Sequence, residues 1–386
     1  MIKNKSQGPQ GRFAHGAPVA CAGSMAHDCS ATRPVAGLAI TVAAMAMLLG
    51  GCLPGGGGSS DGSPATAPVT AAAPAPAATP APATSPSPSP APAPGPAPVP
   101  PPSPAPAGPL YDRDPVIASC DAGQLKLSEK QRALNTVNSI RALHGLKPVV
   151  YDNTSDIDTA KSALMSVANQ SLSHTPPTSW NCYTPEGARG SGNSNLFLRW
   201  SSAKSDFATE AGIASLLIDD GVASLGHRRW LLHPFLSDTS FGRVDGKPFA
   251  NNNWATGMTL KVIGSPDADL TGNNTTYVAY PVGNYPASYF KHGWFMSFSV
   301  IADKRGTFYN GQTNVDFASA TIQVLGPGGI NMTLTSPSVD YQGFGLPNSV
   351  QWITQGTQNN VTYTVKISNV FVRGTAQNFS YPFTIQ

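Results

Sequence analysis

Charged residues are scarce in this sequence of 386 residues: they make up 12% of it, and only three of them are glutamates. From Tyr111 onward, 20 lysines and arginines face 19 aspartates and glutamates, so this region is close to neutral. It therefore offers no electrostatic basis for binding nucleic acid or an anionic membrane surface. The cysteines are also few, five in all, and no two of them have the Cys-x-x-Cys spacing of a structural zinc site.

The N-terminal segment has the features of an export signal. Val35–Leu49 is an apolar run rich in Ala and Leu that is too short to span a membrane comfortably. It continues into Leu-Gly-Gly-Cys at residues 49–52, which resembles a bacterial lipobox, in which the Cys52 thiol receives diacylglycerol. The alternative is an ordinary secretory signal whose cysteine is incidental. Either signal predicts that residues 1–51 are absent from the mature protein.

Residues 52–110 have the composition of a stalk. Of the 37 prolines in the chain, 20 lie in residues 53–110, most of them alternating with Ala or Ser. Alternating prolines favour the extended polyproline II form, and at about 3.1 Å per residue such a tether reaches about 180 Å. The lipid and the stalk together predict an exported domain anchored in the bacterial cell envelope. The expected location is the outer membrane of a cell with two membranes, or the cell surface.

The chain from residue 111 has helical patterns first and strand patterns afterwards. Apolar periodicity predicts helices at residues 128–144, 156–172 and 206–218, followed by a short helix through His227. The first helix is expected to open on a capping box at residues 128–131, which includes Glu129, and residues 178–195 are expected to form a loop. Strands are predicted at residues 241–244, 258–263, 277–280, 295–300, 321–325, 331–335, 350–354, 362–371 and 381–385. This order predicts an α+β fold, with a main domain at 111–300 and a β-rich extension at 301–386 packed on it or part of it.

Cys120 and Cys182 are the cysteines that remain after processing and acylation. In an oxidising compartment, two cysteines most simply form one disulfide. This bond would join the start of the domain to the loop beside His174.

Two histidines stand in the segments that give the best lead to function. They are His174 in Ser-His-Thr-Pro-Pro (173–177) and His227 in Gly-His-Arg-Arg-Trp-Leu-Leu (226–232). Imidazole binds metals and transfers protons near neutral pH, so two histidines in one cleft would indicate a functional site. The alternative is that each histidine caps its own helix and the two never meet.

Taken in order and spacing, these segments resemble the CAP superfamily of SCP-like extracellular proteins. The resemblance rests on Arg-Ala-Leu-His-Gly-Leu-Lys-Pro-Val-Val-Tyr (141–151), Leu-Ser-His (172–174), Gly-His-Arg-Arg-Trp-Leu-Leu-His-Pro (226–234) and Phe-Gly (241–242). It covers roughly residues 127–300 and implies an α-β-α sandwich with a central cleft. In many members two histidines and two glutamates line that cleft, and some members bind zinc or calcium there. The histidines match His174 and His227.

The glutamates that the resemblance implies are missing from this sequence. Ser194 stands where one of them is expected, and the second acid falls at Asp219 or Asp220. Ser194 beside His227 would form a nucleophilic dyad if both lined the cleft. However, the serine lacks the Gly-x-Ser-x-Gly elbow that exposes a nucleophile. Glu186 could reach the cleft from its loop.

A metal in the cleft is expected to be zinc or calcium. Catalytic zinc usually has three protein ligands, so the predicted set is His174 and His227 with Glu186, or with Asp219 or Asp220 in its place. A separate candidate for calcium binding lies at Asp267–Gly272, which resembles the start of an EF-hand loop. The twelfth position of that loop, however, is Val278 rather than Glu. A polar surface turn is the alternative interpretation.

Two functional classes follow from these patterns. The first is a non-catalytic module that binds an envelope lipid, glycan or protein, and the missing glutamates, the neutral domain and the tether favour it. The second is a metal-dependent, peptidase-like hydrolase that uses His174 and His227 with an acid, which would be Asp219, Asp220 or Glu186. An acid that converges on both histidines would favour the hydrolase.

Overall fold

The computed structural model of the chain describes residues 109–204, 206–249 and 253–386. The predicted signal peptide, Cys52 and nearly all of the predicted stalk lie outside these residues. None of the helices in the described ranges has the length and apolar character needed to cross a membrane.

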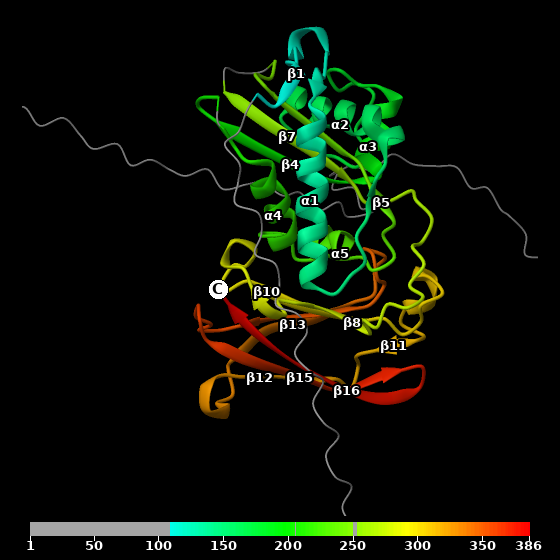
Figure 1. The fold of residues 1–386 in the computed structure, drawn as a ribbon, viewed down its shortest axis with the longest axis vertical. Coiled ribbons are helices and arrows are strands. Elements are labelled where there is room, and N and C mark those ends of the chain that lie inside the picture. The colour runs from blue at the N-terminus through cyan, green and yellow to red at the C-terminus, as the bar shows by residue number, and fades with distance from the viewer. Residues whose placement is uncertain (1–108, 205, 250–252) are drawn as a thin grey trace, which may run out of the picture. The chain divides into compact units, whose positions relative to one another are not determined.

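Helices and strands are interspersed in the N-terminal part of the described chain (Figure 1). Short 3₁₀ helices lie at Ile117–Ser119 and Asn153–Ser155. The main elements are β1 (Tyr111–Arg113), β2 (Gln124–Leu125), α1 (Leu127–Leu143), β3 (Val150–Tyr151), α2 (Asp156–Asn169), α3 (Pro185–Gly192), β4 (Ser194–Ser201), α4 (Thr209–Ile218), α5 (Gly226–Leu231), β5 (Asp238–Thr239), β6 (Phe241–Gly246) and β7 (Trp254–Lys261).

An antiparallel sheet in the order β4-β7-β6 forms the centre of this part. Because side chains alternate along a strand, neighbouring residues of the sheet face opposite layers. Phe197, Phe241 and Met258 belong to the same core as Val137 of α1 and Ile213 of α4. The side chains of the other face form a second core with α2, which contains Leu198, Val244, Ala255, Ala163, Leu164 and Val167. Helices therefore cover both faces, and the predicted α-β-α sandwich is confirmed.

Glycines let α2 lie directly on this sheet. A Cβ atom at Gly242 of β6 would overlap main-chain atoms of Thr159, and one at Gly257 of β7 would lie 2.8 Å from the main-chain oxygen of Ala163. Both neighbours belong to the backbone of α2, which cannot move aside as a flexible side chain can. The two glycines therefore set the distance between helix and sheet.

The C-terminal part is built of strands, as predicted. They are β8 (Tyr277–Tyr280), β9 (Gly283–Tyr285), β10 (Phe295–Val300), β11 (Val315–Asp316), β12 (Thr321–Leu325), β13 (Leu334–Asp340), β14 (Ser349–Thr354), β15 (Thr362–Val372) and β16 (Thr375–Ile385). One sheet has the order β13-β14-β10-β8, and the other has the order β11-β15-β16-β9 with β12 also paired to β15. We call the part of the chain from β8 to β16 the β extension.

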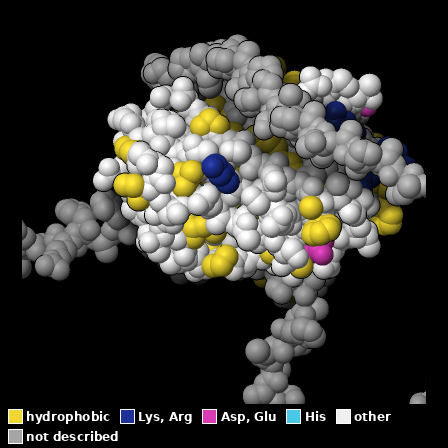
Figure 2. Space-filling model, turned by 90° about the horizontal axis from the view of Figure 1, so that it is seen from below, with side chains coloured by type: hydrophobic (Ala, Val, Ile, Leu, Met, Phe, Trp, Pro, Cys, Tyr) yellow, Lys and Arg dark blue, Asp and Glu magenta, His cyan; other side chains and the backbone are white. Residues whose placement is uncertain are grey.

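Aromatic side chains join the two sheets of the β extension. The ring of Phe298 in β10 lies 5.1 Å from that of Phe379 and 6.1 Å from that of Tyr381, both in β16. Strands from both sides of residue 300 share one sheet, because β10 pairs with β14. Together, β12, β15 and β16 contain a single charged residue, Lys366. Figure 2, which views the molecule from below, accordingly shows few charged side chains.

Two buried arginines of α5 attach the N-terminal part to the β extension. Arg228 donates to the main-chain oxygen of Phe295 at the start of β10, at 2.8 Å. Arg229 forms a 2.8 Å ion pair with Asp340 of β13 and a 2.7 Å hydrogen bond to the main-chain oxygen of Gln342. These contacts explain why both side chains are buried although they are charged.

Two local predictions were wrong. The first helix begins at Leu127, and its N-cap residue, Lys126, forms no side-chain cap. Glu129 is instead buried at 3% exposure, where it accepts a hydrogen bond from the Thr209 hydroxyl at 3.1 Å and lies 3.3 Å from Arg132. The predicted loop at 178–195 contains all of α3 and the start of β4.

Candidate functional site

His174 lies in the turn after α2, half-buried against α3. Its Nδ1 donates a 2.8 Å hydrogen bond to the main-chain oxygen of Ser191. A carbonyl oxygen only accepts, so Nδ1 carries the proton and Nε2 of the neutral ring keeps its lone pair. Burial is the main cause that lowers the pKa of His174, the Ser191 hydrogen bond opposes it, and the nearby His227 lowers the pKa further.

His227 lies in α5 and is buried at 5% exposure. Its Nδ1 is 2.7 Å from Oδ1 of Asp219. The carboxylate accepts a hydrogen bond from Nδ1–H, so the ring is fixed with Nδ1 protonated, and Nε2 of the neutral form again keeps a lone pair. Neither Nε2 forms a hydrogen bond within the described part of the chain.

Asp219 is held in place from three directions. It ends α4 in a left-handed conformation with φ 56°, which aspartate tolerates better than most residues. Its Oδ2 accepts from the backbone N–H of Arg228 at 3.1 Å, and its main-chain oxygen accepts from the indole of Trp294 at 3.1 Å. Trp294 immediately precedes β10, so the β extension braces the acid that orients His227.

The two histidines occupy one region of the fold although they are far apart in sequence. His174 bonds to the main-chain oxygen of Ser191, three residues before β4 begins at Ser194. A third element reaches the same region, because the Asn195 side chain in β4 donates to the main-chain oxygen of His227 at 2.9 Å. The turn after α2, the start of β4 and α5 therefore converge, and the two Nε2 atoms are their free hydrogen-bond acceptors.

Ser194 is the first residue of β4, directly before Asn195, and is 2% exposed. Its hydroxyl has no hydrogen-bond partner among the described residues. The serine–histidine hydrogen bond that activates a nucleophile is therefore not formed with His174 or His227.

The predicted acids lie apart from the histidine pair, with the exception of Asp219. Glu186 is in the first turn of α3, where its own backbone N–H and the Thr184 hydroxyl lower its pKa. Asp220 forms a 2.5 Å ion pair with Lys291 on the surface. Across the described ranges, no three His, Cys, Asp or Glu side chains lie close enough together to hold a metal ion. The residues present thus do not fit a zinc site with three protein ligands.

The segment that resembles an EF-hand start is tied into the fold by its aspartates. Asp267 accepts from the backbone N–H of Thr307 at 2.7 Å and from its hydroxyl at 3.0 Å. Asp269 accepts from the backbone N–H of Thr271 at 2.8 Å, which closes a turn. These contacts occupy the oxygens that a calcium ion would need, and they favour the interpretation as a polar turn.

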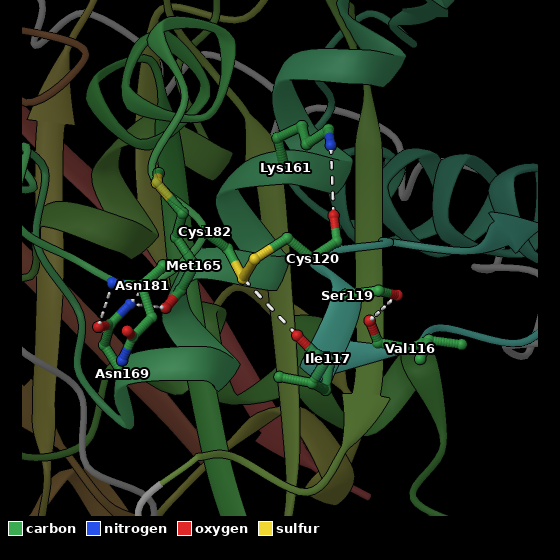
Figure 3. Close-up of a disulfide and its surroundings, with 9 residues drawn as sticks. All are labelled: Val116, Ile117, Ser119, Cys120, Lys161, Met165, Asn169, Asn181 and Cys182. Carbon is green, nitrogen blue, oxygen red and sulfur yellow. Dashed lines mark hydrogen bonds between the residues drawn. A yellow bond between two sulfur atoms is a disulfide. The ribbon is translucent and has the colours of Figure 1, made fainter.

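The predicted disulfide between Cys120 and Cys182 is confirmed (Figure 3). Its Cα atoms are 5.2 Å apart, and the bond joins the 3₁₀ helix at Ile117–Ser119 to the segment between α2 and α3. The Asn169 amide at the end of α2 holds the same segment through the main-chain oxygen of Asn181 at 3.0 Å. Because His174 lies in this segment, both contacts limit its motion.

A pocket of about 620 Å³ lies away from the histidine pair. It is formed where α1 ends and β8 begins, and its lining includes His144, Asn273, Thr275 and Tyr277 but neither His174 nor His227. His144 is not free to act there, because its Nδ1 donates to the main-chain oxygen of Ala279 at 2.8 Å and its Nε2 is 3.1 Å from the hydroxyl of Tyr285. The chemistry of the histidine pair therefore remains the stronger indication of a site.

Sequence reasoning missed the residues that support this site. Trp294 lies 75 positions from Asp219, and no local pattern relates the two. Asn195 is not among the predicted site residues, yet its side chain contacts the backbone of His227. Asn195 directly follows Ser194 at the start of β4, a strand that was not predicted. Its place next to a predicted site residue could have indicated a role in the site.

Comparison with known proteins agrees with the geometry. Residues 134–258 match the model of the CAP family, described as the cysteine-rich secretory protein family. The match begins in α1, contains His174, Ser194, Asp219 and His227, and ends in β7. No match was found among curated proteins. Residues 134–258 are thus similar to the CAP family, and the β extension follows them.

Proposed function

We propose that this chain is an exported binding protein that its lipid anchor and stalk hold in the bacterial cell envelope. The main support for the proposal is the set of contacts that Asp219 makes. Among the described acids, it is the one that contacts either histidine. Its carboxylate is used by the His227 ring and by the backbone N–H of Arg228. It does not contact His174 in the described structure, so the two histidines do not share an acid as a third metal ligand.

The class of ligand is inferred from the free Nε2 atoms of His174 and His227. Each Nε2 offers a lone pair and no charge in the neutral ring, so it can accept a hydrogen bond from a hydroxyl or amide group of a ligand. The sheet that contains β12 and β15 is also poor in charge. A groove of about 410 Å³ lies on it, lined by neutral polar residues such as Thr321, Gln323 and Asn331 and by one charged residue, Lys366. These features favour an envelope glycan over a lipid or a protein.

The test is a binding measurement on the full chain carrying Cys52→Ser, which removes the acylation site. Neutral oligosaccharides released from the cell envelope are the probes, and vesicles of envelope lipid serve as the competing class. We expect His174→Ala and His227→Ala each to weaken glycan binding at least about tenfold, the loss of a good hydrogen bond in a buried site.

His292→Ala is the matched control, because its ring nitrogens bond to Thr357 and Asn359 instead. Its glycan affinity should equal that of the unsubstituted chain. Binding to vesicles but not to glycans would overturn the proposal. Glycan binding that neither His174→Ala nor His227→Ala weakens would also overturn it.

The Asp219–His227 pair also favours a second function, a peptidase-like hydrolase. A carboxylate on Nδ1 orients an imidazole so that Nε2 can take a proton from water or hold a metal. The test is incubation of the chain with a mixed peptide library, with and without added zinc. Cleavage that disappears in His227→Ala would establish the hydrolase and displace the binding function.

A further inference from the structure

A small cavity lies between α5 and the sheet that contains β8 and β10. Its volume is about 20 Å³, which is room for about one water-sized species. Its lining consists of Arg228, Arg229, Leu232, Val278, Ser297, Ser299 and Leu346. The histidine pair and the outer groove of the β extension do not share it.

The cavity presents hydrogen-bond donors that lack acceptors. Arg229 is 6% exposed, and its Nε has no partner among the described residues, although its other nitrogens bond to Asp340, Gln342 and Leu346. The hydroxyl of Ser297 accepts from Arg228 at 3.4 Å, so its own proton remains to be donated. The Ser299 hydroxyl forms no hydrogen bond within the described ranges, and this residue is 8% exposed.

Positive charge is concentrated around the same space. The Arg228 guanidinium donates to the main-chain oxygens of Leu217, Ile218 and Phe295, and no ion pair joins it to a carboxylate among the described residues. The charge of Asp219 nevertheless acts on Arg228, and Arg229 is paired with Asp340. No acidic side chain lines the cavity. Burial lowers the pKa of both arginines, which reflects the cost of keeping their charges away from water. An anion in the cavity would offset part of that cost.

We propose that this cavity binds one monatomic anion, chloride in ordinary buffers, between α5 and β10. The Arg229 Nε–H and the hydroxyls of Ser297 and Ser299 donate to it, and the two guanidinium groups supply the opposite charge. Polyatomic anions such as sulfate and gluconate are too large for the space. The bound ion strengthens the contact between the CAP domain and the β extension, so the stability of the chain depends on chloride.

The first test is thermal unfolding of the full chain carrying Cys52→Ser, at fixed ionic strength, with chloride exchanged for gluconate. We expect the midpoint to rise in a saturable way by about 2–4 °C in chloride, since a ligand that binds only the folded state stabilises it. The double variant Ser297→Ala/Ser299→Ala should lose this rise. Ser338→Ala, an exposed serine of β13 in the same sheet, should keep it.

The second test identifies the occupant without any variant. Crystals grown in bromide should show an anomalous scattering peak within hydrogen-bond distance of Arg229 Nε. A water molecule at that position with no bromide peak would overturn the proposal, and so would equal midpoints in chloride and gluconate. If the double variant does not fold, these two results on the unsubstituted cavity still decide the question.

Discussion

His144 is a buried imidazole that makes stability depend on pH. Burial is the first cause that lowers its pKa from 6.5 to about 4, and burial likewise lowers the pKa of His233 to about 3. Both are neutral in the folded state at pH 5, whereas the unfolded chain binds protons below about pH 6.5. Stability is therefore complete above pH 6.5 and falls as the pH drops towards 4, by about 3 kcal/mol for His144 alone.

Urea unfolding at several pH values between 7 and 4 measures this dependence. The variant His144→Gln removes one of the titrating groups, so the curve between pH 6.5 and 4 should become less steep, and His233 still contributes to the remaining slope. The variant also lowers stability at pH 7. An unchanged slope in the variant would show that His144 does not carry the effect.

Asp219 determines which nitrogen of His227 is protonated. Asp219→Asn removes the charge that accepts from His227 and from the backbone N–H of Arg228. We expect a loss of about 2 kcal/mol in the free energy of unfolding, because hydrogen bonds to charged groups contribute about 1.5–3 kcal/mol each. Nitrogen NMR of the ring should show Nδ1 protonated in the unsubstituted chain and a mixture of tautomers in the variant. A single unchanged tautomer in both would contradict this role.

At the scale of elements, the close contact between α2 and β6 requires a residue without a side chain, Gly242. Gly242→Ala places a Cβ against the backbone of Thr159, so helix and sheet must separate. We expect a loss of about 3 kcal/mol, the upper range for overpacking a core. Gly343→Ala is the matched control, since its Cβ would meet nothing within 4 Å. Chemical denaturation should therefore distinguish the two variants, and equal stabilities would refute the close approach.

The disulfide constrains the segment between α2 and α3. Cys120 and Cys182 are 62 positions apart, and in the chain-entropy account a bond closing a loop of this length stabilises by about 4 kcal/mol. Reduction should lower the free energy of unfolding by about that amount and weaken ligand binding through His174. Denaturation with and without a reductant measures the first effect. The double variant Cys120→Ala/Cys182→Ala should not respond to the reductant, and any response would locate the effect elsewhere.

How well the elements could be predicted depended on how local their signals were. The strands at 277–280, 295–300 and 321–325 were predicted with the bounds that β8, β10 and β12 have. Helix α3 was missed because its sequence is rich in Gly and Ser. Gly190 is needed there for tertiary packing, since a Cβ at that position would overlap the backbone of Asp158. The Thr184 N-cap followed by Pro185 was the local signal that could have revealed this helix.

At the scale of the whole molecule, the sequence predicted the CAP domain and its histidines but not what holds them. The segments that carry His174 and His227 are local motifs, so they can be recognised in one sequence. The contacts of Trp294 with Asp219 and of Arg229 with Asp340 join distant parts of the chain. Such contacts depend on how the β extension packs on α5, which no local pattern specifies.

The central claim is that the histidine pair binds its ligand through free ring nitrogens rather than through a metal with three protein ligands. Calorimetric titration of zinc and calcium into the full chain carrying Cys52→Ser, with and without His174→Ala, tests this claim most directly. Two histidines without a third ligand hold a metal weakly, so we predict no micromolar binding that depends on His174. Micromolar zinc or calcium binding that His174→Ala abolishes would contradict the account and establish the cleft as a metal site.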